Sequence, residues 1–231
     1  MEKRELKLFK SRAIEKNSDK KNITDIEDEV LARIEEIRAG DCVIGEGKTA
    51  KVYICEKDPW SCYKIISSSY YPRLKVDQEM KFMDEAIKLG IRVPLPIFSM
   101  VDGNVESLAM ERVNGQSIKE IVEDDLGLPE NFDLDNFFAE LNDFLRILHT
   151  NRIYHRDLHE GNVMIDDKGK PWIIDFGDAS CSFSEEEAYI SHSVSPRTKK
   201  MESIRYTSDE NNLAKIRGIL RGYVMSQKAN T

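Results

Sequence analysis

The spacing of apolar residues changes once along this chain, and that change limits the possible folds more than any other feature. Between residues 41 and 111, apolar and polar residues alternate in short stretches bounded by turn residues, which predicts β-strands. Beyond residue 115 the spacing is mainly helical. The strands are expected at 41–46, 50–55, 61–66, 97–101 and 106–111, and a helix at 73–89, ended by Gly90, interrupts them. The sequence therefore predicts an α+β protein with a β-rich lobe followed by an α-rich lobe.

The α-rich part is expected to contain two longer helices and one β-hairpin. A broad apolar stripe covers residues 133–150, and a weaker stripe covers 208–227. Between them, strands are expected at 163–166 and 171–174, joined by a turn at 167–170. Little sequence is left for further helices, so this lobe is expected to be small.

Residues 1–40 are expected to form a helical extension. Apolar residues recur there at three- and four-residue steps, with Asn22 or Thr24 as a cap and Gly40 as the end: Ile23, Ile26, Val30, Ile34 and Ile37. Such a stripe needs a packing partner, and docking on the adjacent lobe is favoured over a separate partner protein. The expected division of the chain is 1–40, 41–113 and 114–231.

Composition excludes several classes of protein. With 40% hydrophobic and 33% charged residues and no long uncharged apolar run, neither a membrane protein nor a disordered chain is indicated. Four cysteines without a C-x-x-C pair, and no visible secretory leader, favour a reduced cytoplasmic protein; delivery into a host cell as an effector is the alternative. A formal net charge of −8 disfavours direct binding to nucleic acid, although residues 1–22 carry eight basic and four acidic groups.

A glycine-containing turn lies between the first two expected strands. Its sequence is Gly45-Glu46-Gly47-Lys48-Thr49-Ala50-Lys51-Val52. Glycines allow a tight turn there and let backbone N–H groups approach an anion such as phosphate. A glycine pair in a hairpin is also an ordinary structural turn, so this motif carries weight only together with others.

The third expected strand carries a lysine on its apolar side. Alternation places Lys64 on the same face as Cys62, where a buried ammonium group needs an anion. The helix expected at 73–89 offers Glu79 on the side that faces the sheet, whereas Glu85 projects from a different side. We expect a Lys64–Glu79 ion pair, with two solvated surface charges as the alternative.

The most informative polar cluster is His155-Arg156-Asp157-Leu158-His159-Glu160-Gly161-Asn162, followed by Asp175-Phe176-Gly177. Phosphoryl transfer from a nucleotide requires a carboxylate that orients the attacking hydroxyl and oxygen ligands that hold Mg²⁺. Asp157, Asn162 and Asp175 are side chains of these types. The intervening hairpin can fold Asp175 back beside Asn162. The cluster therefore predicts phosphoryl-transfer chemistry.

Taken in order, these motifs resemble the protein-kinase-like superfamily. The resemblance covers about residues 41–178 and rests on Gly45-x-Gly47, Lys64, Glu79, His155-Arg156-Asp157, Asn162 and Asp175-Phe176-Gly177. It implies a two-lobed kinase fold with a truncated C-terminal lobe, and ATP with Mg²⁺ as the phosphoryl donor.

The resemblance also implies roles for single residues. Lys64 would hold the α/β-phosphates and pair with Glu79, and Asp157 would orient the acceptor hydroxyl. Asn162 and Asp175 would bind Mg²⁺. The nucleotide pocket would be completed by Gly45, Gly47, Val52 and an interlobe hinge at Met110, Glu111 and Val113.

Departures from the typical protein kinase pattern indicate a compact atypical branch. Few residues follow Gly177, no Ala-Pro-Glu motif is present, Ala50 replaces the third glycine, and His159 replaces the lysine usual two residues after the catalytic aspartate. Segments 47–53 and 83–96 look like RIO-type atypical kinases. The short tail is also similar to the KEOPS kinase subunit and to small bacterial effector kinases.

The leading interpretation is a serine/threonine protein kinase that acts on a protein substrate and autophosphorylates in the serine-rich segment 178–208. A partner protein that completes the short α-rich lobe is a further candidate. Two alternatives stay open: a small-molecule phosphotransferase of the aminoglycoside- or choline-kinase type, and a nucleotide-binding signalling scaffold. Retention of Lys64, Asp157, Asn162 and Asp175 together favours an enzyme over the scaffold.

Overall fold

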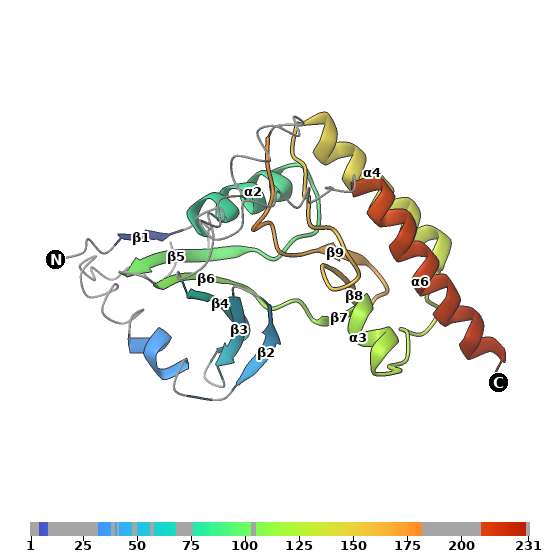
Figure 1. Ribbon diagram of the computed structural model, residues 1–231, viewed down its shortest axis with the longest axis horizontal. Coiled ribbons are helices and arrows are strands. Elements are labelled where there is room, and N and C mark those ends of the chain that lie inside the picture. Colours follow the sequence, from blue (N-terminus) through green and yellow to red (C-terminus); the bar gives the residue numbers. More distant parts are fainter. Residues whose placement is uncertain are drawn as a thin grey trace, which may run out of the picture. The chain divides into compact units, whose positions relative to one another are not determined.

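The computed structural model describes residues 5–8, 32–37, 40, 42–47, 50–55, 58–67, 76–102, 105–181 and 209–229 (Figure 1). The chain divides into two compact units. The first unit comprises Met1–Tyr71, Lys75–Lys81 and Leu95–Arg112, and the second comprises Pro72–Leu74, Phe82–Pro94 and Val113–Thr231. The first unit is rich in strands and the second in helices, which confirms the predicted α+β fold class.

A six-stranded antiparallel sheet forms the first unit, with strand order β1-β5-β6-β4-β3-β2. Its strands are β1 (Glu5–Leu8), β2 (Val43–Glu46), β3 (Ala50–Cys55), β4 (Asp58–Ser67), β5 (Pro96–Asp102) and β6 (Val105–Glu111). The five strands predicted from alternation are all present. Strands that follow each other in the sequence, such as β5 and β6, pair directly, because a short connection joins antiparallel neighbours.

Strand β4 shows how alternation separates the two faces of this sheet. Tyr63 and Ile65 belong to an apolar cluster on one face. Cys62 and Lys64, which alternate with them, lie on the opposite face and are also buried. Both faces of β4 are therefore covered, so a polar side chain on it must find a partner within the protein.

Residues 32–37 are helical and cover the face of the sheet that carries Tyr63. Ile34 and Ile37 are buried there, at 4% and 3% exposure, which confirms that this helix docks on the adjacent lobe. The Gly40 N–H donates to a carbonyl one turn earlier at 3.0 Å, as expected for a helix end. The earlier part of the predicted stripe, at 23–30, lies outside the described residues.

The prediction of helix throughout residues 1–40 is wrong at one place. Glu5–Leu8 form strand β1, which pairs antiparallel with β5 at the edge of the sheet. An edge strand gains hydrogen bonds from a neighbour that is distant in sequence, so four residues without a clear period carry no local signal for it.

Helix α2 (Val76–Lys88) matches the amphipathic segment expected at 73–89. Its apolar side is buried: Val76, Met80, Met83 and Ala86. Gly90 has φ +81°, and the N–H of Ile91 donates to the carbonyl of Ala86 at 3.0 Å. This is the hydrogen-bond pattern of a glycine-terminated helix, so Gly90 ends α2 as predicted.

The described part of the second unit combines a small antiparallel sheet, ordered β7-β8-β9, with three complete helices and the last part of α2. Its elements are β7 (Gly115–Ser117), α3 (Ile118–Glu123), α4 (Leu134–Thr150), β8 (Val163–Asp166), β9 (Pro171–Ile173) and α6 (Asp209–Ala229). All but β7 and α3 were predicted. Gly169, at φ +72°, forms the predicted turn between β8 and β9.

Helix α3 was missed although its start carries a recognisable pattern. The Ser117 hydroxyl accepts a hydrogen bond from the Glu120 N–H, and the Glu120 carboxylate accepts one from the Ser117 N–H. This is a capping box, in which each side chain satisfies a free N–H of the other residue. The sequence Ser-x-x-Glu before an apolar residue could have revealed it.

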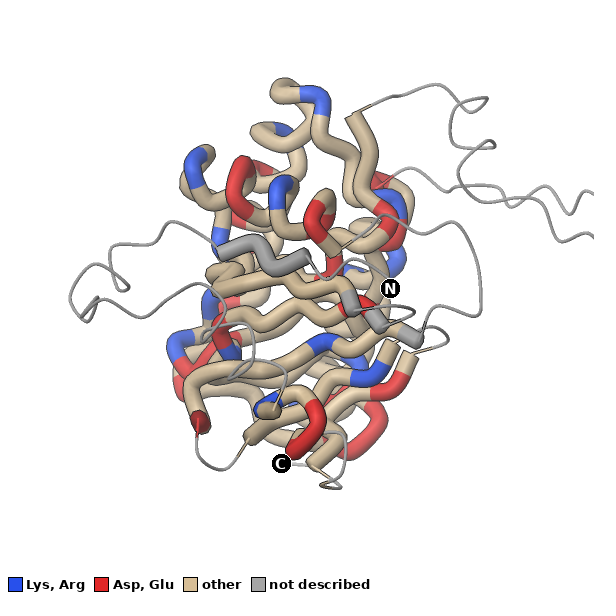
Figure 2. The backbone as a smooth tube through the Cα atoms, turned by 90° about the vertical axis from the view of Figure 1, so that its left-hand side faces the viewer, with Lys and Arg blue, Asp and Glu red and all other residues tan. Residues whose placement is uncertain are grey.

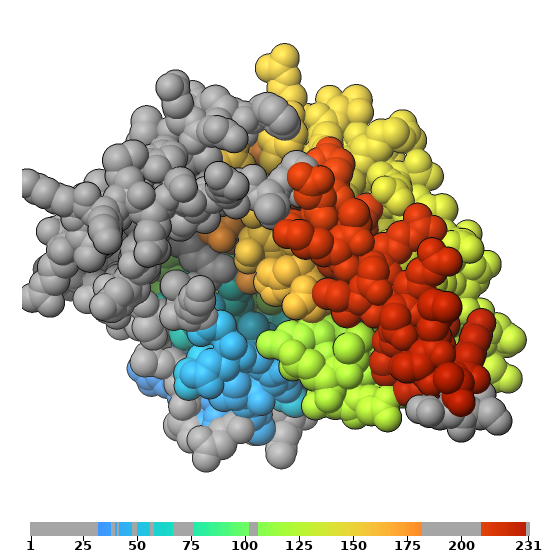
Figure 3. All heavy atoms as spheres, turned by 45° about the vertical axis from the view of Figure 1, so that its right-hand side comes forward, coloured from blue at the N-terminus to red at the C-terminus, as the bar shows by residue number. Residues whose placement is uncertain are grey.

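Helix α6 packs against α3 and α4 through one apolar side. The buried residues of this apolar side are spaced at three- and four-residue steps: Leu213, Ile216, Leu220 and Tyr223. Figure 3 shows α6 as a red band whose other side is open to view beside α3 and α4. Among the described residues, none of the helices combines the length and apolar character needed to cross a lipid bilayer.

The loop after α2 is attached to the second unit through Arg92. Its guanidinium lies 2.6 Å from the Glu140 carboxylate and its Nε donates to the Pro171 carbonyl at 2.9 Å. The Arg92 carbonyl accepts from Ile173 N–H at 3.0 Å, and its side chain lies over the Phe144 ring. These contacts explain why Phe82–Pro94 groups with the second unit although β4 and β5 belong to the first.

Charged residues of both signs are interspersed along the described chain, as the view in Figure 2 shows. Several of these charges form pairs on helix surfaces, such as Lys88 with Asp84 at 2.8 Å. Exposed pairs of this kind contribute about 0–1 kcal/mol each. They therefore describe a solvated surface and mark no binding site.

Candidate active site

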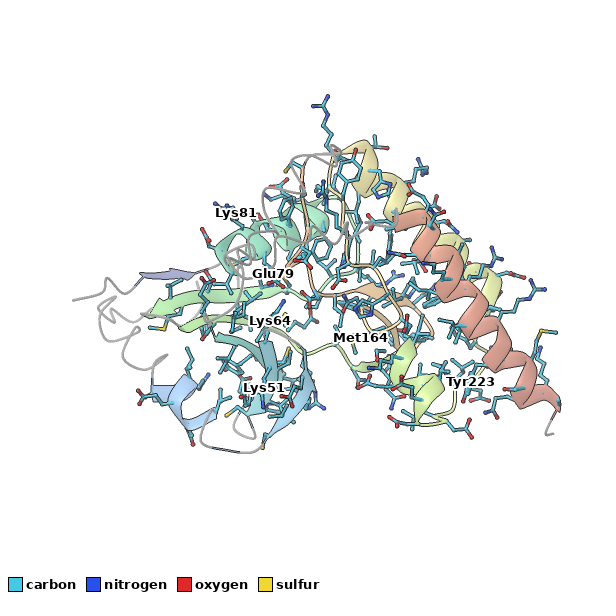
Figure 4. The ribbon with its side chains drawn as sticks, viewed as in Figure 1. Lys51, Lys64, Glu79, Lys81, Met164 and Tyr223 are labelled. Carbon is cyan, nitrogen blue, oxygen red and sulfur yellow. The ribbon has the colours of Figure 1, made fainter. Side chains whose placement is uncertain are left out.

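The buried lysine and glutamate of the first unit form the predicted pair. Lys64 Nζ on β4 lies 2.7 Å from Glu79 Oε1 on α2, and the two side chains are 3% and 1% exposed. Figure 4 shows them directed toward each other from the sheet and from the helix. Glu85 is exposed and pairs with Lys88 at 2.8 Å, so the choice of Glu79 over Glu85 is confirmed.

This pair is an expensive feature for a small protein. Desolvation of an ammonium and a carboxylate costs several kcal/mol per ion, and their attraction compensates only in good geometry. Two apolar side chains of similar volume would often stabilise the same space equally well or better. The pair therefore indicates a functional requirement for an amine held in place on β4.

The glycine turn and Lys64 lie in one row across three strands. Gly45 pairs with Val52, and Val52 pairs with Lys64. An ideal Cβ would come no closer than 3.7 Å to other atoms at Gly45 and 3.5 Å at Gly47, and neither residue has a positive φ. Contacts among the described residues thus do not require glycine at either position. Close approach of an outside group such as phosphate would require it, because a Cβ would occupy that space.

The predicted hinge residues lie at the end of β6 and just after it: Met110 and Glu111 end the strand, and Val113 follows. Met110 and Cys62 are partners across β6 and β4. The N–H of Glu111 donates to the Leu95 carbonyl at 2.8 Å, and its carboxylate accepts from Leu95 N–H at 3.1 Å. Val113 is buried and begins the second unit. Glu111 thus uses its N–H and its side chain within the first unit, and its carbonyl oxygen accepts a weak hydrogen bond from the Cys62 thiol at 3.6 Å.

The loop at residues 155–162 holds Asp157 and Asn162 together in the second unit. Asn162 Nδ2 donates to the Asp157 carbonyl at 2.8 Å and lies 3.3 Å from its carboxylate Oδ2. The Asn162 N–H donates to the His159 carbonyl at 2.9 Å, which closes the loop. Because the NH₂ group of Asn162 faces Asp157, its Oδ1 oxygen is directed away from that residue and is the atom suited to a cation.

The β8–β9 hairpin brings Asp175 back toward Asn162, as predicted. The N–H of Ile174 donates to the Asn162 carbonyl at 3.0 Å. Asp175 has φ +62°, which is uncommon for a residue other than glycine, and its Oδ1 accepts from Gly177 N–H at 3.1 Å. Backbone conformations of this kind cost about 1–3 kcal/mol and concentrate at functional sites.

The surroundings of Asp157 raise its pKa above the ordinary value for an aspartate. Burial raises the pKa of Asp157, His159 opposes this shift, and the carboxylates of Asp178 and Asp175 raise it further. A carboxylate with a raised pKa is also a better acceptor for a hydroxyl proton.

Asp209, the first residue of α6, supports this loop and was not predicted from the sequence. Its buried carboxylate accepts from the N–H groups of His155 and Arg156, both at 2.9 Å. It also lies 3.0 Å from His149 Nε2, while His149 Nδ1 lies 2.8 Å from Glu210. Arg156 has φ +67°, so Asp209 stabilises a strained backbone beside Asp157. Acidic residues are common at helix starts for dipole reasons, which hid this role in the sequence.

A second contact joins the loop to the Asp175 segment. His155 is fully buried, its Nε2 lies 2.9 Å from the Ile174 carbonyl, and its ring lies 5.0 Å from that of Phe176. Phe176 is itself fully buried. The segments that carry Asp157 and Asp175 are therefore packed against each other through His155, Ile174 and Phe176, which limits the movement of both carboxylates.

The structure assembles the predicted site residues in two groups. The first unit contains Lys64, Glu79, Gly45, Gly47, Val52, Met110 and Glu111. The second unit contains Asp157, Asn162, Asp175 and Val113. Convergence of the two groups around one nucleotide stays a prediction.

The second group has the donor set that Mg²⁺ prefers. The amide oxygen of Asn162 and the carboxylate of Asp175 are hard oxygen donors, and Mg²⁺ commonly takes one or two protein ligands with phosphate and water completing its shell. Across the described ranges, the structure has no group of three or more His, Cys, Asp or Glu side chains arranged to hold a metal ion. The two donors therefore fit a magnesium ion that also takes phosphate and water ligands.

Comparison with curated proteins finds kinases of two kinds. The chain is 28% identical over 122 residues to 3-deoxy-D-manno-octulosonic acid kinase of Vibrio cholerae, covering 49% of each protein. It is 33% identical over 78 residues to serine/threonine-protein kinase grp of Drosophila melanogaster, covering 34% of this chain and 15% of that protein. A probable serine/threonine-protein kinase of Clostridium acetobutylicum is 32% identical over 81 residues, 35% of this chain and 12% of that protein. The chain thus spans about half the length of the Vibrio relative and less of the other two.

The family comparison covers most of the described site. The model of the protein kinase domain matches residues 40–210, which include the glycine turn, the Lys64–Glu79 pair and the loop with Asp157, and reach Asp209. This stretch is well over half of the chain. The chain therefore belongs to the protein kinase domain family.

Proposed function

We propose that this protein transfers the γ-phosphoryl group of Mg-ATP to a hydroxyl group. The observation that carries the proposal is the buried Lys64–Glu79 pair at 2.7 Å, in a chain whose second unit holds Asp157, Asn162 and Asp175 together. An amine on the sheet and oxygen ligands on the loops are the protein groups that phosphoryl transfer requires.

Each residue has a role that suits its surroundings. Lys64 would hold the α/β-phosphates, with its ammonium position set by Glu79. Asn162 Oδ1 and the Asp175 carboxylate would hold Mg²⁺, which when bound supplies charge neutralisation at the phosphate oxygens. Gly45 and Gly47 would let backbone N–H groups approach the phosphates.

Asp157 would act on the acceptor. Its carboxylate would accept a hydrogen bond from the acceptor hydroxyl and so orient the oxygen toward the phosphorus. Because the transition state of phosphoryl transfer is loose, most of the rate gain would come from such positioning and from charge neutralisation.

We propose a serine or threonine hydroxyl of a protein as the acceptor. The names of the Drosophila and Clostridium relatives support this choice. Autophosphorylation within residues 178–208 is part of the proposal; most of that segment lies outside the described residues.

A small-molecule acceptor is the second candidate. The Vibrio relative, whose name identifies it as a kinase of 3-deoxy-D-manno-octulosonic acid, aligns over more of this chain than the two serine/threonine kinases do. A sugar acid would present a hydroxyl to Asp157 in the same way as a serine side chain.

One experiment separates these candidates. Wild-type protein and the variants Lys64→Ala and Asp157→Asn are incubated with radiolabelled Mg-ATP, alone, with casein and with 3-deoxy-D-manno-octulosonic acid. Labelled protein supports the first candidate, and a labelled sugar acid with unlabelled protein supports the second. Nucleotide binding without transfer would refute both and favour a scaffold. Asp157→Asn is expected to bind ATP normally and to lose turnover by about 10²-fold or more.

A further inference from the structure

His159 lies in the loop that holds Asp157, and the proposed roles do not use it. The Gly161 N–H donates a hydrogen bond to His159 Nδ1 at 3.0 Å. A ring nitrogen that accepts a hydrogen bond carries a lone pair, so the proton of the neutral imidazole is on Nε2. Nε2 lies 3.8 Å from Asp157 Oδ2. The glycine N–H therefore selects the tautomer that presents an N–H group to the carboxylate.

The missing side chain at Gly161 makes this arrangement possible. An ideal Cβ at this position would lie 2.8 Å from His159 Cε1 and 3.0 Å from Nδ1. The φ angle of Gly161 is not in the positive range, so its backbone conformation is open to other residues. A larger residue at this position would push the imidazole ring away from its hydrogen bond, because the ring is the end of a half-exposed side chain and can move.

Two donors face the same oxygen of Asp157. Asn162 Nδ2 lies 3.3 Å from Oδ2, and His159 Nε2 lies 3.8 Å from it. The second distance is too long for a hydrogen bond, so in this tautomer the contact is the weaker attraction between the N–H dipole and the carboxylate. Within the described residues, both of these contacts are made to Oδ2 and neither is made to Oδ1. The carboxylate is therefore contacted at Oδ2, and Oδ1 is left to accept a hydrogen bond from the hydroxyl group of a substrate.

We propose that His159 is a positioning residue for Asp157. Held by Gly161, its Nε2–H attracts Oδ2 and leaves Oδ1 to accept the hydrogen bond of the acceptor hydroxyl. The catalytic consequence rests on the proposed phosphoryl transfer, whereas the His159–Gly161 hydrogen bond does not depend on it.

The first measurement concerns the hydrogen bond alone. NMR of ¹⁵N-labelled full-length protein at pH 8 should show a through-hydrogen-bond coupling between the Gly161 amide nitrogen and His159 Nδ1. The chain has four histidines, so the His159 signals are assigned by their loss in His159→Gln. Assigned signals without this coupling, or with the ring proton on Nδ1, would overturn the proposal whether or not the protein is a kinase.

The second measurement separates positioning of Asp157 from support of the loop. His159→Ala should lower kcat about tenfold, as loss of an orienting partner does, while KM for ATP stays unchanged. His159→Gln keeps an N–H donor near the Nε2 position and should restore part of the rate. His159→Asn keeps an acceptor near the Nδ1 position without that donor and should not. Equal recovery by both variants would show a structural role and refute the proposal.

A double-mutant cycle tests the part played by Gly161. Gly161→Ala should reduce kcat as much as His159→Ala does, yet have no effect when His159 is already alanine. Gly127→Ala is the matched control, because a Cβ there meets nothing within 4 Å. Additive effects of the two changes would refute the coupling. Wild-type protein that transfers no phosphoryl group would refute the proposed function and the catalytic consequence with it, while the NMR coupling would still report the hydrogen bond.

Discussion

Replacement of Asp209 by alanine should destabilise the second unit far more than loss of a surface carboxylate. Asp209 is 4% exposed and accepts hydrogen bonds from two backbone N–H groups at 2.9 Å, with His149 at 3.0 Å. Removal of the carboxylate leaves two N–H groups without their acceptor, at about 1–3 kcal/mol each. We therefore expect a loss of about 3 kcal/mol in the free energy of unfolding.

The control for this prediction is a carboxylate with a similar contact at the surface. Asp135 lies 2.9 Å from Arg217 but is 87% exposed, so Asp135→Ala should cost less than about 1 kcal/mol. Urea unfolding can be followed by the fluorescence of Trp172 in a Trp60→Phe background, since the chain has two tryptophans and Trp60 is 81% exposed. Equal unfolding free energies for the Asp209 and Asp135 variants would refute the inference that Asp209 supports the loop.

The same carboxylate and two cysteines lead to further predictions. The hydrogen bond with Asp209 raises the pKa of His149, and burial lowers it by a smaller amount. Protonated His149 therefore stabilises the folded protein below pH 6.5, and this stabilisation is lost as the pH rises through the raised pKa. Burial raises the pKa of Asp209, but hydrogen bonds from His149 and the loop backbone lower it further, so the net shift is downward. The ionised Asp209 therefore stabilises the folded protein above pH 3.8, and this stabilisation is lost as the pH falls through the lowered pKa. Thermal unfolding from pH 2 to 9 should show both limits, and a His149→Gln variant that keeps the alkaline decline would contradict the assignment. Burial raises the pKa of Cys62 to about 12, so iodoacetamide at pH 8 should label the exposed Cys181 and leave Cys62 unmodified, which peptide mass spectrometry would show.

Local patterns in the sequence were sufficient for most elements of the fold. Alternation identified β2 to β6, because a strand with a buried face repeats every two residues. The stripe of α2 placed Glu79 toward the sheet and Glu85 away from it, and so led to the Lys64–Glu79 pair. The prediction of helix failed at Glu5–Leu8, where the strand depends on an edge of β5 about ninety residues away.

For the candidate site, the sequence by itself determined which residues have suitable chemistry. The residue types identify Asp157, Asn162 and Asp175, and the turn signals predict the hairpin between the last two. Only the tertiary structure revealed the groups that hold them. Asp209 is joined to the loop through the backbone N–H groups of His155 and Arg156, and His159 through that of Gly161. Every residue except proline has the same backbone N–H group, so the sequence does not indicate which residue donates a hydrogen bond to a given side chain. Such contacts can be recognised only in the folded structure.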